Sequence, residues 1–204
     1  MAETSAFHEG VATRTQPTAT AHRRSDPNSI VAIFGASSDR ARLGCAVIAA
    51  FLAGAASNGT VSWATTVTIV VLLPVLLMGQ RRTTLPPSLI TSAAVIGFFT
   101  WVATAEPSAP RPLGAILLGA ALTAAPLAVA QFTVPSARGA TETKLAAVLG
   151  GALGIVEPTA GLVAISIAAT LTVAASLVRR RPVTVFAPGM VAGAVGVVAS
   201  LAWL

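Results

Sequence analysis

The chain has 204 residues, of which 54% are hydrophobic and 10% are charged, and its formal charge is +6. Soluble domains contain about 25% charged residues, so this chain has too few charges to cover a water-exposed surface. Apolar stretches of about 20 residues, the length that crosses a bilayer as a helix, occur several times. The composition therefore predicts an all-α, polytopic membrane helix bundle and excludes an ordinary soluble domain.

The basic charge and the rarity of cysteine and histidine exclude several kinds of site. Basic residues without interleaved aromatic residues do not favour nucleic-acid binding, and we expect them at the cytoplasmic membrane face. The single cysteine, Cys45, cannot form an intramolecular disulfide or a cysteine-based metal cluster. The two histidines, His8 and His22, lie in the polar N-terminal region. We therefore expect no metal and no cofactor.

Residues 1–41 differ in composition from the rest of the chain. They are rich in Thr, Ala, Ser and Pro, with mixed charges and little apolar periodicity. This pattern is typical of a disordered polar tail. The apolar segment 30–36 is too short to span a membrane, and we assign it to the tail, with a short interfacial segment as the alternative. Residues 42–204 are expected to form the transmembrane helical bundle.

Seven apolar stretches follow the tail, separated by polar or proline-containing segments such as "SNGT" at 57–60. The stretch before residue 145 is expected to be a loop, and Pro74 and Pro126 are expected to kink the spans that contain them. We predict about seven transmembrane helices, over residues 43–57, 61–79, 89–105, 113–133, 145–156, 159–178 and 186–204.

The distribution of charge predicts the orientation of these spans. With a cytoplasmic N-terminus, Arg111 is the only basic residue of the outer loops, as the positive-inside rule expects. The basic residues of the inner loops are Arg40, Arg42, Arg81, Arg82, Arg138, Lys144, Arg179, Arg180 and Arg181. Trp63, Trp101 and Trp203 fall near predicted outer ends, where interfacial anchors occur. The sequence thus predicts a multi-pass protein of the cell membrane in contact with the lipid bilayer.

Small residues recur at four-residue spacing in two of the predicted helices. Gly150 and Gly154 form one pair, and Gly189 and Gly193 form another. Small residues let helix backbones approach closely in lipid. We expect ordinary packing within the bundle here, with a specific dimer face as the alternative.

Carboxylates are scarce, and none falls in the middle of a predicted span. Glu106 and Glu157 lie on the outer side, and Asp39 and Glu142 lie at the inner face, while the other three are in the tail. This placement argues against an ion-coupled transporter. Asp39, beside Arg40 and Arg42, is expected to be a solvated flanking charge.

Glu142 has two interpretations. It is either a first-turn acid that the helix dipole favours, paired with Lys144 or Arg138, or the carboxylate of a functional site. The residues around it support the second interpretation through a resemblance. The sequence Gly139-Ala140-Thr141-Glu142-Thr143-Lys144-Leu145, followed by an Ala/Gly-rich helix, resembles the second motif, GxGDxKL, of the type IV prepilin peptidase family of membrane aspartic proteases.

The first motif of that family, D-x-R-x-x-x-x-P, is similar to residues 79–86. Gly79 stands at the aspartate position, Arg81 matches the arginine, and Leu85-Pro86 matches the end of the motif. The C-terminal "RRRPVTVFAPGMVAGAVGVVASLAWL" is also similar to the family's basic turn and last Gly/Ala-rich helix. The resemblance covers roughly residues 61–204.

The resemblance implies an aspartic endopeptidase, a hydrolase that cuts leader sequences of pilin-like precursors of the type IV pilus at the cytoplasmic face. That chemistry needs two carboxylates that share a proton. Gly79 replaces the first, and Glu142 is one methylene longer than the second, with Thr141 in place of a glycine. Since a displacement of about 1 Å can cost on the order of a hundredfold in rate, we expect a pseudoenzyme whose activity is lost or much reduced.

The resemblance also implies binding residues and partners. Arg81 and Lys144 are the candidates for holding a substrate leader, and the implied partner is a pilin-like precursor or a secretion component. The alternative is a non-catalytic membrane binding or assembly protein unrelated to peptidases, because Ala/Gly-rich helices resemble one another easily. The two hypotheses differ in whether Gly79 and Glu142 lie side by side at the inner face.

Overall fold

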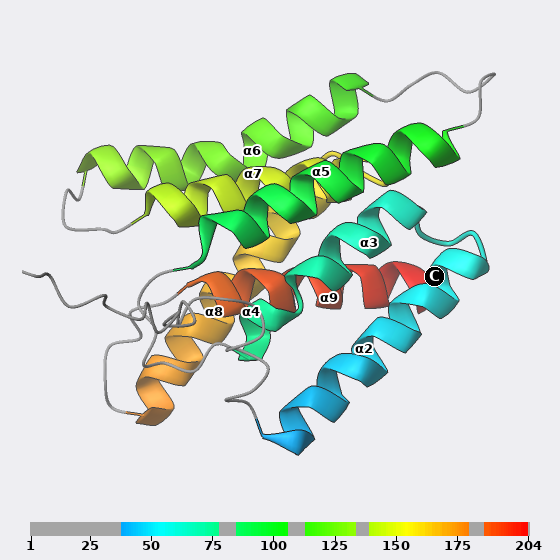
Figure 1. The fold of residues 1–204 in the computed structure, drawn as a ribbon. Coiled ribbons are helices and arrows are strands. Elements are labelled where there is room, and N and C mark those ends of the chain that lie inside the picture. Colours follow the sequence, from blue (N-terminus) through cyan, green and yellow to red (C-terminus); the bar gives the residue numbers. More distant parts are fainter. Residues whose placement is uncertain (1–37, 78–84, 106–112, 134–138, 180–185, 204) are drawn as a thin grey trace, which may run out of the picture.

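The computed structural model describes residues 38–77, 85–105, 113–133, 139–179 and 186–203, and these residues form helices without strands (Figure 1). The helices are α2 (Asp39–Ser57), α3 (Trp63–Leu72), α4 (Pro74–Leu77), α5 (Pro87–Thr104), α6 (Leu113–Thr133), α7 (Ala140–Gly154), α8 (Ala160–Arg179) and α9 (Ala187–Trp203). Four of them, α2, α5, α6 and α8, are long and apolar enough to cross a membrane. The described part of the chain is therefore all-helical, with helices suited to a bilayer.

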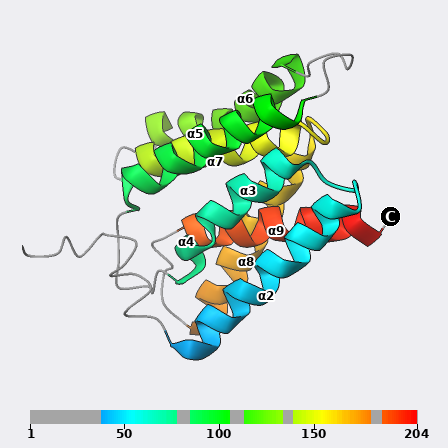
Figure 2. The same ribbon diagram turned by 45° about the vertical axis from the view of Figure 1, so that its right-hand side comes forward.

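The helix ends gather at two opposite ends of the bundle (Figures 1 and 2). The starts of α2, α5, α7 and α9 lie at one end, together with the ends of α4, α6 and α8. We name this the Glu142 end, after the residue in the first turn of α7. The start of α3 and the ends of α2, α5 and α9 lie at the opposite end, which we name the Trp63 end. Successive helices therefore alternate in direction, with α3 and α4 together acting as one broken helix.

Much of the helix surface that faces outward is apolar. Only between 11% and 28% of the residues in the four candidate spans are buried inside the protein. Large hydrophobic side chains such as Phe132 on α6 and Leu177 on α8 are 88% and 72% exposed. In water such a surface would be unfavourable, so it is suited to contact with lipid.

Two predicted boundaries are corrected by the structure. The helix α2 begins at Asp39, so residues 39–41 are helical and do not belong to the polar tail; the Ser38 hydroxyl accepts a hydrogen bond from the Ala41 amide at 3.4 Å and caps the helix. The helix α7 begins at Ala140, five residues before the predicted start, because the Thr143 amide donates to Gly139 O at 2.8 Å and opens the first turn. The predicted tail over residues 1–37 lies outside the described residues.

Pro74 interrupts its helix as predicted. A proline has no backbone N–H, so it removes one hydrogen bond from the helix ladder. The break falls at Leu73, whose amide donates instead to Val70 O, three residues earlier, at 3.2 Å. The buried Cys45 thiol of α2 approaches Leu73 O at 3.8 Å, so α2 packs against the break. Pro126 lies within α6, which continues past it.

Glycines place two pairs of helices in close contact. Between α6 and α7, a Cβ on Gly154 would lie 2.6 Å from Ala115 O, and one on Gly150 would lie 2.5 Å from Gly119 O. Between α8 and α9, a Cβ on Gly193 would overlap Ala164 O. Only the absence of side chains allows these approaches. The prediction that the four-residue spacings serve packing within the bundle is confirmed.

The helix α7 lies at the centre of the bundle. Eight of its fifteen residues are buried, including Leu149 and Leu153, which belong to the hydrophobic core. The Thr65 hydroxyl of α3 donates to Ala152 O of α7 at 2.6 Å, in the interior. Within the described ranges the buried polar side chains are four threonines, and no charged side chain is buried.

Candidate functional site

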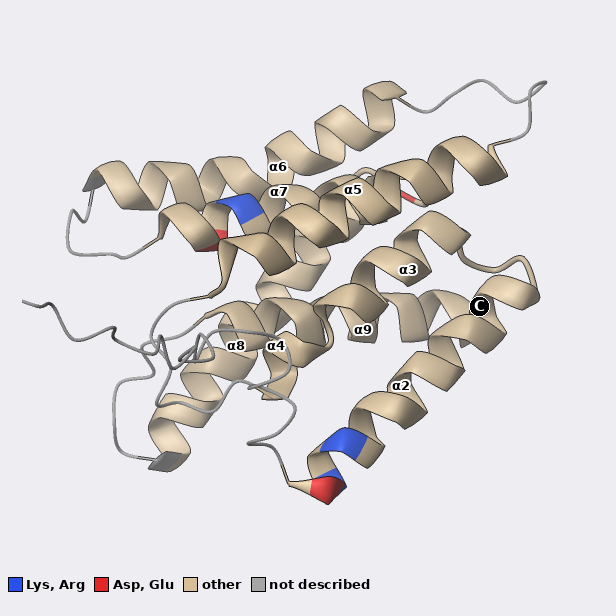
Figure 3. Cartoon of the chain, viewed as in Figure 1, with Lys and Arg blue, Asp and Glu red and all other residues tan. Residues whose placement is uncertain are grey.

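The predicted site centres on Glu142, which lies in the first turn of α7 at the Glu142 end of the bundle (Figure 3). Its neighbour Lys144 is also described and is exposed. The other two predicted site residues, Gly79 and Arg81, lie outside the described residues. The structure therefore gives the surroundings of the second motif but not of the first.

The carboxylate of Glu142 binds the backbone at the start of α9. Its Oε1 accepts a hydrogen bond from the Phe186 amide at 2.9 Å. Phe186 immediately precedes α9, and its carbonyl accepts from the Met190 amide at 3.2 Å, one helical turn later. Amides at the start of a helix have no partner within the helix, and a carboxylate there also interacts favourably with the helix dipole.

This contact gives Glu142 a structural partner 44 residues away in the sequence. It is a charge-assisted hydrogen bond, which is stronger than one between neutral groups. It joins the first turn of α7 to the residue before α9. Glu142 does lie in the first turn of α7, as the first interpretation predicts. Its predicted ion pair with Lys144 does not form, and its carboxylate accepts the Phe186 amide instead. Arg138, the other suggested partner, lies outside the described residues.

The glycine that begins the motif has a packing role. A Cβ on Gly139 would lie 2.6 Å from the Nε2 atom of Gln131, near the end of α6. That Nε2 atom is buried and has no hydrogen-bond partner among the described residues. A larger residue at position 139 would displace the Gln131 side chain from the start of α7.

Asp39 does not supply a second carboxylate near Glu142. It begins α2, whose start lies on the opposite side of the Glu142 end from α7 (Figures 1 and 3). Its side chain is 97% exposed and forms an ion pair with Arg42 at 3.4 Å, as expected of a solvated flanking charge. The described residues thus contain no carboxylate pair at this end, and no three of their His, Cys, Asp or Glu side chains come together as a metal site requires.

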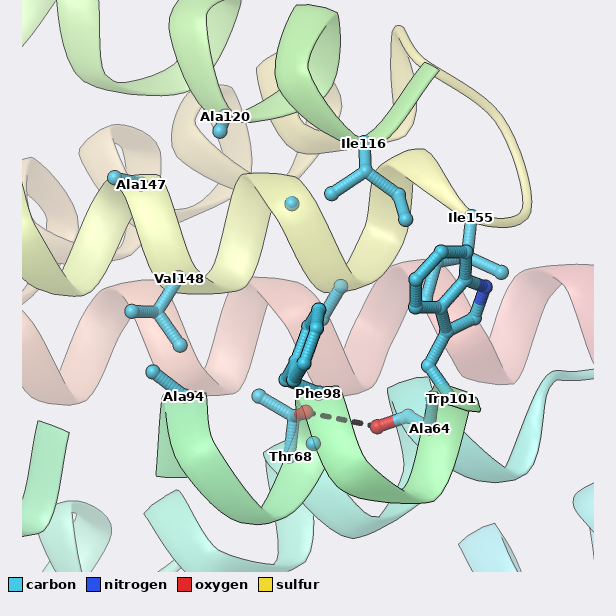
Figure 4. Close-up of a pocket in the computed structure, with 13 residues that line it drawn as sticks. Ala64, Thr68, Ala94, Phe98, Trp101, Ile116, Ala120, Ala147, Val148 and Ile155 are labelled. Carbon is cyan, nitrogen blue, oxygen red and sulfur yellow. Dashed lines mark hydrogen bonds between the residues drawn. The ribbon is translucent and has the colours of Figure 1, made fainter. Parts of the chain in front are cut away.

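A separate apolar pocket lies between α3, α5, α6 and α7 (Figure 4). It has a volume of about 210 Å³ and is lined mainly by small and apolar side chains. Its lining on α7 begins at Ala147, more than one helical turn after Glu142. The pocket is therefore distinct from the predicted site.

Phe98 and Trp101 of α5 form the aromatic side of this pocket (Figure 4). Their ring centroids are 5.9 Å apart. Trp101 is 8% exposed, whereas Trp63 and Trp203 are 43% and 85% exposed. The prediction of an interfacial anchor is therefore wrong for Trp101, which is buried by its neighbours. An aromatic residue near a helix end predicts an anchor, and the burial depends on packing against α7 that the sequence does not reveal.

A comparison of the chain with models of protein families, with curated proteins and with solved structures gives no match in any of the three.

Proposed function

We propose that this chain is a multi-pass protein of the cell membrane with the layout of a prepilin peptidase and without peptidase activity. In this proposal it has seven crossings: α2, the broken helix α3–α4, α5, α6, α7, α8 and α9. The alternating helix directions support this count, although α7 has only 15 residues. At about 1.5 Å per residue α7 is shorter than the hydrocarbon core, so its burial by neighbouring helices is what makes it suitable as a central crossing.

The described charges support a cytoplasmic position for the Glu142 end. Arg40 and Arg42 lie in the first turn of α2, and Lys144 lies near the start of α7. All three are at this end, whereas Glu157 follows α7, whose end lies beside the start of α3 because the Thr65 hydroxyl donates to Ala152 O. Basic residues are enriched on the cytoplasmic side of membrane proteins. The N-terminus, which precedes α2, is then also cytoplasmic.

The hydrogen bond between Glu142 and the Phe186 amide is the observation that most directly supports the proposed loss of peptidase activity. Aspartic protease chemistry uses two carboxylates that share a proton and activate a water molecule. Here one carboxylate position of the motif is Gly79, and the carboxylate at the other position binds a backbone amide. A carboxylate used in this way stabilises the bundle, and among the described residues it has no second carboxylate with which to share a proton.

The remaining role in this proposal is binding a membrane partner. The exposed Lys144, with Arg81 of the first motif, would bind the polar leader of a pilin-like precursor or a secretion component at the cytoplasmic face. Without cleavage the protein would hold such a partner or assist its assembly. A membrane binding or assembly protein unrelated to peptidases is the second candidate, favoured by the fact that capping of α9 alone accounts for Glu142 and by the absence of a family match.

A cleavage assay with a purified pilin-like precursor in proteoliposomes tests the proposal. The parent chain is expected to leave the precursor intact, and the double variant Gly79→Asp, Glu142→Asp is expected to cleave it, because both acid positions of the motifs are then restored. The single variant Glu142→Asp is the matched control, since it shortens the same side chain without adding the second acid.

Two outcomes would contradict parts of the proposal. Robust cleavage by the parent chain that Glu142→Ala abolishes would show an active peptidase. An inert double variant that retains the helix content of the parent, together with no binding of the precursor by the parent, would favour the protein unrelated to peptidases.

A further inference from the structure

The apolar pocket between α5 and α6 is lined by only two side chains with hydrogen-bonding groups, Thr68 and Trp101, and Figure 4 shows the Trp101 indole nitrogen on the side of its ring away from Phe98. Its lining comes from four helices and consists of aliphatic, aromatic, alanine and glycine residues apart from Thr68. The Thr68 hydroxyl donates to Ala64 O at 2.8 Å, as Figure 4 shows, so its proton is already engaged. A polar head group or peptide would lose its own hydrogen bonds here without replacing them. The chemistry of the walls therefore selects a hydrocarbon.

The size of the pocket limits that hydrocarbon. The lining on and just after α7 runs from Ala147 to Ile155, which corresponds to about 12 Å along the helix axis. An apolar cavity of about 150 Å³ binds a benzene ring, so a volume of about 210 Å³ holds a somewhat larger hydrocarbon group. A helix, with a diameter of about 10–12 Å including its side chains, does not fit.

The pocket is continuous with the surface that faces lipid. Phe98 lines it and is nonetheless 55% exposed, and its neighbours Ile96 and Phe99 on α5 are 44% and 65% exposed. On the other side of the pocket, Leu117 of α6, next to the lining residue Ile116, is 68% exposed. A chain in the surrounding bilayer therefore reaches the pocket without crossing any polar surface.

We propose that this pocket binds a segment of one acyl chain of a membrane phospholipid, inserted between α5 and α6 against α7. The pocket includes Ala64 near the start of α3 and Trp101 near the end of α5, so it lies toward the Trp63 end. The lipid then belongs to the leaflet at that end. The chain packs against Phe98 and Trp101 and separates α5 from α6, which both contact α7. This proposal does not depend on the proposed function of the Glu142 end.

Trp101 provides a direct test, because it lines the pocket and is itself 8% exposed. The full chain with Trp63→Phe and Trp203→Phe retains Trp101 as its single tryptophan. It is reconstituted into phosphatidylcholine vesicles whose acyl chains carry bromine, which quenches tryptophan fluorescence on close approach. We expect Trp101 to be quenched about as strongly as the exposed Trp203 is in the corresponding single-tryptophan chain, despite its burial by protein.

Filling the pocket should remove this quenching. A Cβ on Gly151 would make ordinary contacts, the nearest at 3.5 Å from the Ile116 side chain, so Gly151→Leu directs its additional carbons into the pocket. Ala120→Leu fills the pocket from α6 and serves as a second variant should the first fold poorly. Each should lose at least half of the quenching. Ala169→Leu, on the exposed side of α8, is the matched control and should leave it unchanged.

Two results would overturn the proposal. Weak quenching of Trp101 in the parent would mean that the pocket is closed or is filled by a side chain of a second copy or another protein. Equal quenching in the parent and in both folded filling variants would mean that bromine reaches Trp101 from the outer surface. Circular dichroism of every variant confirms that helix content is retained before the quenching values are compared.

Discussion

The two halves of α7 are held in the bundle by different means. The first half carries Glu142 and is joined to the start of α9 by one charge-assisted hydrogen bond. The second half contains Gly150 and Gly154, whose backbones touch α6 so closely that no side chain fits between them. The first half therefore combines the buried Leu145 and Ala146 with one polar contact, and the second half depends on close backbone packing.

This difference bears on how the resemblance to prepilin peptidases is interpreted. The second half follows the general packing of membrane helices, in which small residues let backbones meet. It would look the same in an unrelated bundle, so it carries little information about function. The first half is the informative part, and there the only carboxylate of the motif caps a neighbouring helix.

The largest expected effect is at Gly150 in the second half. A Cβ there would lie 2.5 Å from both Gly119 O and the Thr123 Cβ, so Gly150→Ala must separate α6 from α7. We expect a loss of about 1–3 kcal/mol in the free energy of unfolding, measured by SDS titration in mixed micelles. Gly151→Ala is the adjacent control, because its Cβ has 3.5 Å of clearance. Gly151→Ala should be neutral or stabilising by about 0.4–1 kcal/mol. Equal losses in the free energy of unfolding for the two variants would contradict the close backbone contact between α6 and α7.

The next effect is at Glu142 in the first half. Glu142→Ala leaves the Phe186 amide without its acceptor, and we expect a loss of about 1–2 kcal/mol in the free energy of unfolding, as for other lost helix caps. Glu142→Gln keeps an oxygen acceptor of the same length and should retain most of the stability. If Glu142→Ala is as stable as the parent chain in the same SDS titration, the carboxylate is free for another role and the structural interpretation is wrong.

A smaller effect is expected where α3 contacts the second half of α7. Thr65→Val removes the hydroxyl that donates to Ala152 O at 2.6 Å and preserves the shape of the side chain. Hydrogen bonds between membrane helices contribute about 0.6 kcal/mol on average, so a loss of about that size is expected. Thr100→Val is the control, since its hydroxyl donates within α5 to Ile96 O on an exposed surface. A larger loss for Thr100→Val would contradict the assignment.

The sequence predicts the positions of most helices because long apolar stretches identify them without reference to neighbours. The predicted span 113–133 coincides with α6, and the predicted span 159–178 lies within one residue of α8 at each end. The start of α7 is missed because the polar residues of "TETK" resemble a loop, whereas in the structure they form a first turn that the acid at position 142 favours.

The contacts that define the candidate site depend on tertiary structure. The partner of Glu142 is a backbone amide, and backbone amides carry no signature in the sequence. The pocket beside Trp101 is likewise missed, because its lining comes from four separate helices. The sequence therefore places Glu142 at the start of a helix, as the structure does, and leaves its partner undetermined.

The distance between the two motifs tests the central claim, that both lie together at the Glu142 end. The structure places the end of α4, at Leu77, at this end with the start of α7, and Gly79 follows Leu77 by two residues in the sequence. With the single native cysteine removed by Cys45→Ala, spin labels at Gly79→Cys and Lys144→Cys report the distance by pulsed electron paramagnetic resonance in proteoliposomes. We expect a single short distance, well below the hydrocarbon thickness of about 30 Å. A distance of about 30 Å or more would place the motifs at opposite ends or on opposite sides of the bundle and would contradict the account.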